Sequence, residues 1–182
     1  MKKGIGKNLS TSKQYNRGLI LQLIATNEAT SRIELATTTM LTKMTITNIV
    51  SEYIEHGIVE QCEEKITEGS GRNPIRLRIA EKAPTVIGLY ITRDKIEAVL
   101  CTLGLEILNR KVMPFKTLKK EEVRQYSYHV IDQLLAETDL KVLGIGVAVM
   151  GPVDINNGII LNPPHFFGIE NVNITQFLEE QI

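Results

Sequence analysis

The strongest constraint on the fold is the order of patterns in the first 82 residues. Three segments place apolar residues at the three- and four-residue spacing of a helix. Two shorter segments follow, in which apolar and polar residues alternate as in strands, and a Gly-rich turn, TEGSGRNP, separates them. The helices are expected over 16–27, from Ser31 onward, and over 43–56, and the strands over 58–66 and 75–80. This order predicts a winged helix-turn-helix domain over residues 1–82.

Capping residues set the limits of the second and third helices. Ser31 stands before a helical run and Glu34 follows three residues later, which is the pattern of a reciprocal capping box. Thr42 is placed to cap the third helix, and Gly57 is a typical terminator after it. The second helix is therefore short and joined to the third by a tight turn.

The third helix has two unlike faces. Its aliphatic and aromatic residues, Ile46, Ile49, Val50 and Tyr53, fall on one side and are expected to be buried. The opposite side carries Met44, Thr47, Asn48 and Ser51. In isolation such a side is usually only solvated. After a capped helix and before a hairpin, however, it is the face that enters the major groove of DNA.

Charge and side-chain chemistry support a double-stranded DNA partner. Up to Val50 the chain has seven Lys or Arg against two Glu, although the whole chain has 21 of each sign. Short hydroxyl, amide and apolar side chains suit base edges, and Lys43 suits a phosphate. The predicted DNA contacts are Arg17, Ser31, Arg32, Thr42, Lys43, Met44, Thr45, Thr47, Asn48, Ser51, Ser70, Gly71, Arg72 and Asn73. Arg72 at the hairpin tip either enters a minor groove or is an ordinary solvated turn residue.

Residues 83–182 have a different character, and they make the chain α/β, or α+β overall. Three strand-like segments, TVIGLYI, KIEAVLCTL and EILNRKVMPF, precede a helix expected over 119–138. The run VLGIGVAVMG is unbroken and apolar, which predicts a strand covered on both faces. A turn-rich segment and a last helix follow.

Several classes of protein and site are not indicated. The two cysteines, Cys62 and Cys101, have no CxxC spacing or nearby His ladder, so we expect buried reduced thiols and no metal site. The N-terminus lacks the apolar region of a signal peptide, and the longest apolar run is too short to span a membrane. We expect a cytoplasmic protein without cofactor or membrane partner.

With these pieces in order, the chain resembles the ROK family (repressors, open reading frames, kinases), specifically its sugar-responsive repressors, the xylose repressors among them. One match runs from NRGLILQLI through SRIELATTTMLTKMTITNIVSEYIEHGIVEQ to the wing-like GSGRNP. The other is LGIGVAVMGPVDINNGIILNPPHFFGIENV, similar to the family segment that leads to its sugar pocket. The resemblance covers nearly the whole chain from Tyr15.

The resemblance implies that residues 83–182 form the first part of an actin-like, ribonuclease-H-like sugar domain. It also implies a dimeric transcriptional repressor of a carbohydrate-utilisation operon that responds to a sugar effector. Gly151, Asp154 and His165 are then candidate sugar contacts. The residues themselves leave alternatives, because Asp154 suits a turn that caps its own backbone and His165 suits an exposed loop.

Two departures from the family bear on function. ROK kinases have a Gly-Gly phosphate loop after their first strand, whereas GLYITRDK has Arg93 and Asp94 where small residues are needed. The family's catalytic Asp also lies in a motif beyond this segment, so we expect no enzyme activity and weigh a kinase remnant as an alternative. Another alternative is an interaction module that docks a sugar-transport component. Met40 stands where relatives often have Gly in the turn between helices.

Overall fold

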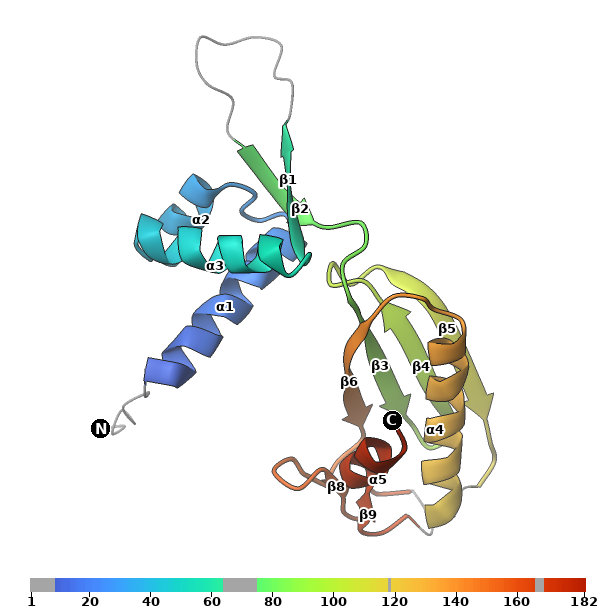
Figure 1. The fold of residues 1–182 in the computed structure, drawn as a ribbon. Coiled ribbons are helices and arrows are strands. Elements are labelled where there is room, and N and C mark those ends of the chain that lie inside the picture. The colour runs from blue at the N-terminus through green and yellow to red at the C-terminus, as the bar shows by residue number, and fades with distance from the viewer. Residues whose placement is uncertain (1–8, 64–74, 118, 166–168) are drawn as a thin grey trace, which may run out of the picture. The chain divides into compact units, whose positions relative to one another are not determined.

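The computed structural model of the chain describes residues 9–63, 75–117, 119–165 and 169–182. The chain divides into two compact units, Met1–Ala83 and Pro84–Ile182 (Figure 1). Both helices and strands occur in each unit, so the predicted mixed α/β class is confirmed.

The N-terminal unit follows the predicted order of three helices and two strands. The strands β1 and β2 pair antiparallel, with Val59 opposite Ile79 and Glu63 opposite Ile75. Helix α1 was predicted to start at Asn16 but begins seven residues earlier, at Leu9. It ends at Ala25, because Asn27 adopts a left-handed conformation (φ 58°) that cannot continue the helix. The elements are α1 (Leu9–Ala25), α2 (Arg32–Thr39), α3 (Lys43–Glu55), β1 (Val59–Glu63) and β2 (Ile75–Ile79).

The apolar side chains of these elements meet in one core. The predicted stripe of α3 is confirmed, since Ile46 and Val50 are fully buried and Ile49 and Tyr53 nearly so. Helix α1 contributes a second stripe, α2 contributes Leu35, and the hairpin contributes one residue from each strand. The α1 and hairpin residues in this core are Ile20, Leu23, Ile24, Val59 and Leu77. Burial of one face of α3 leaves its other face free.

The C-terminal unit is built on a four-stranded sheet in the order β5-β4-β3-β6. Strands β3 and β6 are parallel, and the other neighbours are antiparallel. A small sheet, β7-β8-β9, follows β6 and leads into the last helix. The elements are β3 (Thr85–Ile91), β4 (Lys95–Cys101), β5 (Ile107–Pro114), α4 (Lys120–Ala136), β6 (Val142–Val149), β7 (Val153–Asp154), β8 (Ile159–Ile160), β9 (Val172–Asn173) and α5 (Ile174–Gln181).

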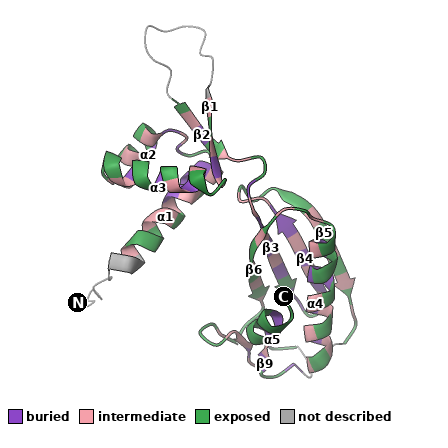
Figure 2. Ribbon diagram, in the orientation of Figure 1, coloured by how far each residue is buried: buried purple, intermediate pink, exposed green. Residues whose placement is uncertain are grey.

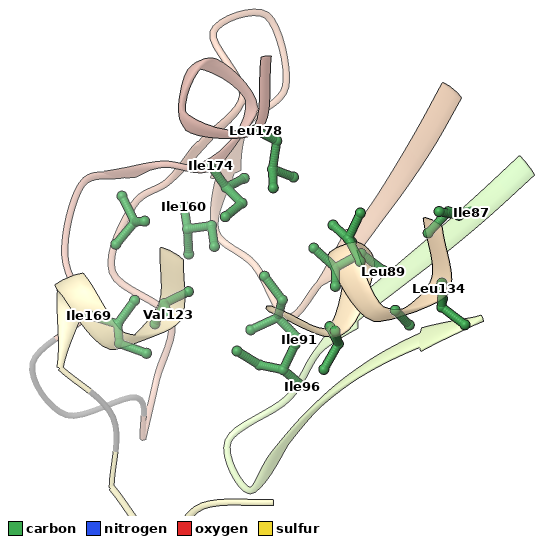
Figure 3. Packing of buried hydrophobic residues seen from close by; sticks show 14 of the residues in the cluster. Ile87, Leu89, Ile91, Ile96, Val123, Leu134, Ile160, Ile169, Ile174 and Leu178 are labelled. Carbon is green, nitrogen blue, oxygen red and sulfur yellow. The ribbon is translucent and has the colours of Figure 1, made fainter. Parts of the chain in front are cut away.

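Helix α4 covers one face of the four-stranded sheet. Every second residue of β3 and β4 is buried on this face, and Val123 and Leu134 of α4 are fully buried with them. Figure 3 shows Ile160, Ile174 and Leu178 continuing this cluster from the small sheet and α5. One core therefore joins α4, α5 and both sheets.

The prediction that both faces of β6 are covered is wrong. Val147 and Val149 pack against the core, but Leu143 is 50% exposed and Met150, just past the strand, 45%. Tyr90 of β3 is 45% exposed on the same uncovered face, where its register partner is Ala148. Within residues 84–182 as described, the helices α4 and α5 pack on the other face (Figure 2). An unbroken apolar run also fits a strand whose outward positions, apart from Leu143, are Gly and Ala, because these residues expose little apolar area.

The two cysteines are free thiols, as predicted. Cys101 is buried, and burial raises the pKa of its thiol. Cys62 is only half-buried, because it lies on the short β1–β2 sheet, so the prediction of burial is wrong for this residue.

Candidate nucleic-acid interface

Helix α2 begins with a modified capping box. The Ser31 hydroxyl accepts a hydrogen bond from the Glu34 backbone N–H at 3.2 Å, as predicted. The Glu34 carboxylate accepts from the N–H of Thr30 at 2.8 Å, one residue earlier than a standard box requires. This bond is the main reason that the pKa of Glu34 is lowered. Ser31 is only 5% exposed and its hydroxyl is used in the cap of α2, so its contact with DNA stays a prediction.

The turn between α2 and α3 is held by threonines. Thr37 and Thr39 donate their hydroxyls to the carbonyls of Ile33 and Leu35, and the helix ends at Thr39. Met40 then adopts a left-handed conformation, φ 57° and ψ 19°. The Thr42 hydroxyl accepts from the Thr45 N–H at 3.2 Å and caps α3, as predicted. Helices α2 and α3 are thus joined by a turn of three residues, Met40 to Thr42.

The outer side of α3 is a continuous exposed surface, which we call the α3 face. Figure 2 shows exposed positions over the start of α3 and the end of α2. The α3 face consists of Lys43, Met44, Thr47, Asn48 and Ser51, all exposed. Thr42 is also exposed, whereas Thr45 is half-buried with its hydroxyl 2.9 Å from that of Thr42. The predicted base-reading side chains therefore share one accessible surface.

An ion pair neutralises one of the two acids of α3. The Arg17 guanidinium contacts both carboxylate oxygens of Glu52, and this hydrogen bonding lowers the pKa of Glu52. Tyr53 donates its hydroxyl to the Arg17 carbonyl at 2.7 Å, and burial raises the pKa of Tyr53 to about 12. Arg17 was predicted to contact DNA, but its guanidinium is used to join α1 to α3.

The β1–β2 hairpin is attached to the start of α2. The Leu77 N–H donates to the Thr30 carbonyl at 2.6 Å, and Arg76 donates to the Thr30 hydroxyl at 2.5 Å. With the Gln61 amide oriented so that its oxygen faces α2, the Arg32 guanidinium lies 2.9 Å from that oxygen. Arg32 is thus bound to the hairpin rather than pointing away from it. The predicted tip residues Ser70, Gly71, Arg72 and Asn73 lie outside the described residues.

Two exposed apolar residues on the α2–α3 segment are not among the predicted DNA contacts. Ile33 is 68% exposed on α2, and Met40 is 89% exposed in the turn. Helical periodicity predicts that Ile33 is exposed, because it lies opposite the buried Leu35. It predicts nothing for Met40, which follows the last residue of the helix.

The candidate sugar residues of the C-terminal unit do not converge. The Asp154 carboxylate accepts from the side-chain amide of Asn157 at 2.7 Å, which is the main cause of its lowered pKa. It also accepts from the backbone N–H groups of Asn157 and Asn156 at 3.2 and 3.1 Å. Gly151 and His165 are exposed, and His165 has a left-handed conformation, φ 65°. Asp154 borders a cavity of about 210 Å³ beside β6, but the lining is otherwise largely Ile and Val, which cannot bind sugar hydroxyls. The sugar contacts stay a prediction.

The turn after β3 does not form a phosphate cradle. The Thr92 hydroxyl donates to Asp94 at 2.7 Å, and the Thr92 N–H donates to the Lys95 carbonyl at 2.9 Å. The turn's polar groups therefore bind one another in a tight hairpin connection between β3 and β4. Over the described parts of the chain, no group of three or more His, Cys, Asp or Glu is placed to hold a metal ion. No helix in these parts is long and apolar enough to cross a membrane.

Comparison with known proteins finds similarity to transcriptional regulators. The chain is 28% identical over 162 residues to a putative xylose repressor of Caldicellulosiruptor sp. strain Rt8B.4, covering 87% of this chain and 40% of the relative. It is 25% identical over 177 residues to the DNA-binding transcriptional dual regulator NagC of Escherichia coli K12, covering 96% of this chain and 43% of NagC. The chain thus spans about two fifths of the length of these relatives.

The fold has a counterpart among solved structures. A crystal structure described as a ROK family transcriptional regulator, a homologue of the E. coli Mlc protein, matches 93% of this chain and 43% of its own, with a TM-score of 0.70 and 22% identity. No family model matches the chain. In sequence and in fold, the chain resembles the ROK-family transcriptional repressors, as its motifs predicted.

Proposed function

We propose that the chain is a sequence-specific DNA-binding repressor of a carbohydrate-utilisation operon. In this proposal, residues 1–82 are a winged helix-turn-helix domain and residues 83–182 are the N-terminal part of an actin-like ROK domain. The observation that carries the proposal is the α3 face, where five exposed side chains lie at the start of a capped helix that follows a three-residue turn. The relatives named as a putative xylose repressor and as a DNA-binding transcriptional dual regulator support it.

Each part of the α3 face has a role in this proposal. Thr47 and Asn48 meet base edges in the major groove, and Asn pairs well with adenine. Lys43 contacts a phosphate, helped by the N-terminal end of the α3 dipole and by the absence of acids in its first turn. The Arg17 pair with Glu52 keeps that carboxylate from repelling the backbone of DNA.

Two copies are needed for a long operator, since one helix reads only a few base pairs. We propose a homodimer on half-sites about 10 base pairs apart. One relative is named a putative xylose repressor, and another, an Escherichia coli O6:H1 protein 25% identical over 177 residues, is named an N-acetylglucosamine repressor. Xylose and N-acetylglucosamine are therefore the sugars to test as effectors.

The test is selection of binding sites from random duplex DNA, followed by titration at several salt concentrations. We expect Asn48→Ala to lose about 1–3 kcal/mol of discrimination at one base pair. Lys43→Ala should weaken binding to all sequences and lower the salt slope by about 1, whereas the matched control Lys116→Ala should not change it. Failure to enrich any sequence over random DNA would contradict the proposal.

A second candidate function, an interaction module, has one observation in its favour. Strand β6 pairs only with β3 among the described residues, so its other edge offers backbone donors and acceptors to a partner strand. Hydrogen exchange of the β6 amides, with and without the purified cytoplasmic domain of a sugar transporter, tests this. Protection confined to β6 would support docking, and unchanged exchange at saturating concentration would count against it.

A further inference from the structure

The most exposed large apolar side chains among the described residues of the N-terminal unit lie on the α2–α3 segment. Among its described residues, Met40 is 89% exposed, Met44 69% and Ile33 68%, whereas the core residues around them are below 9%. Met40 and Met44 flank the cap of α3 and stand four residues apart, on either side of the exposed Lys43. An apolar surface thus borders the proposed phosphate contact.

The conformation of Met40 makes its presence unexpected. Its φ of 57° lies in the left-handed region, where Gly or Asn carries little penalty and a long side chain is unfavourable. Burial offers no compensation, because almost all of the side chain is in solvent. Folding alone therefore favours a different residue at position 40.

DNA offers a chemical partner for such side chains. The C5 methyl of thymine is the apolar group that base pairs present in the major groove. Methionine is unbranched and adaptable, so it can cover a methyl group without a fixed rotamer. The first turn of α3 carries no acid, so DNA phosphates can approach this surface without repulsion.

We propose that Met40 and Met44 form an apolar contact surface that selects thymine by its methyl group at one edge of each operator half-site. The inference rests on the proposed function and adds to it a residue of the inter-helix turn as a determinant of specificity. Lys43 between them fixes the register on the backbone, and Thr47 and Asn48 read the neighbouring base pairs.

The experiment replaces each thymine of the selected site, in turn, by deoxyuridine, which removes only the methyl group. Affinity of the unmodified chain should fall about fourfold at one or two positions, the effect of leaving one methyl group exposed. Met40→Gly and Met44→Ala should each lose the sensitivity at one of these positions. Met40→Leu should keep it, and Ile33→Ala, at the other end of α2, is the matched control that should also keep it.

The variants are chosen so that folding does not confuse the result. Gly suits the left-handed turn, so Met40→Gly should melt at or above the temperature of the unmodified chain. Equal affinity for thymine and deoxyuridine at every position would overturn the inference while leaving DNA binding intact. Full retention of the sensitivity in both Met40→Gly and Met44→Ala would also overturn it. Absence of any selected sequence would instead overturn the proposed function.

Discussion

Helix α3 of the N-terminal unit and strand β6 of the C-terminal unit differ in how their apolar residues are distributed between the buried and the exposed face. Helix α3 buries a narrow apolar stripe and exposes polar side chains, so its free face is suited to a polar, charged partner. Strand β6 is apolar throughout, and the face that α4 leaves uncovered exposes Leu143 with glycines and an alanine. An exposed face indicates a binding partner most clearly when its side chains differ in kind from those of the buried face, as they do in α3.

The largest expected effect is a loss of stability that is confined to the core of one unit. Ile46→Ala should destabilise the N-terminal unit by about 3 kcal/mol, because Ile46 is fully buried and the cavity would be lined by several elements. Hydrogen exchange should accelerate in α1, α2 and α3 and stay unchanged in β3 and β4. The neighbouring exposed Thr47→Ala should change stability by less than about 0.5 kcal/mol. Equal acceleration in both units would break the distinction between their cores.

The next effect tests how tightly the small sheet of the C-terminal unit is packed. Gly158 has a φ of 63°, and a Cβ there would lie 1.9 Å from the Thr175 Oγ1. Gly158→Ala should therefore cost about 2 kcal/mol in chemical denaturation, from backbone strain and the clash together. Gly151→Ala is the control, since its Cβ would meet only Val153 N at 3.6 Å. A Gly158→Ala chain as stable as its control would show that the turn adapts.

A smaller effect of opposite sign tests the uncovered face of β6. A Cβ at Gly146 meets nothing within 4 Å, so Gly146→Ala should stabilise the strand by about 0.5–1 kcal/mol through the lower entropy of the unfolded chain. Gly88→Ala in β3, where a Cβ would lie 3.2 Å from Val99 Cγ2, should gain less or lose stability. Destabilisation by Gly146→Ala would mean that this face is covered in solution.

The smallest effect concerns charge on the sheet. Glu97 of β4 accepts from Lys95 at 2.6 Å and pairs with Arg110 at 2.6 Å, and the Lys95 hydrogen bond is the main cause of its lowered pKa. A carboxyl with a lowered folded pKa stabilises the fold above its ordinary pKa. That contribution is lost as the pH falls through the lowered value.

Thermal melting between pH 7 and pH 3 measures this contribution. The acid-induced fall in melting temperature should be shallower for Glu97→Gln than for the unmodified chain. Glu81→Gln, at an exposed position, is the control and should stay closer to the unmodified chain. Parallel curves for Glu97→Gln and the unmodified chain would show that the ion pairs add nothing measurable.

Local patterns were sufficient for much of the N-terminal unit. The caps at Ser31 and Thr42 and the stripe from Ile46 to Tyr53 depend on contacts within a few residues, so spacing alone predicts them. The strands β3, β4 and β5 were likewise predicted from alternation and turns. A Gly at position 40 would have predicted the left-handed turn, whereas Met40 does not indicate this conformation from the sequence.

Other features depend on residues that are far apart along the chain. Arg17 lies 35 residues from Glu52, so its predicted role at DNA took no account of the ion pair. Arg32 and Ser31 were similarly assigned to DNA before β1 and the packing of α2 were known. Any basic or hydroxyl residue on a helix suits both an internal contact and a phosphate, and spacing does not distinguish them.

The sequence by itself determined the order of the main helices and strands, where two helices are capped, and which side of α3 is free, because these follow from local hydrogen bonding and periodicity. It did not place the start of α1 or the short strands β7, β8 and β9. The tertiary structure decided that polar side chains of α1 and α2, such as Arg17 and Arg32, make contacts inside the fold, and that one face of β6 is uncovered. These outcomes depend on which elements pack together, and that choice is made by the summed burial of residues distant in the chain.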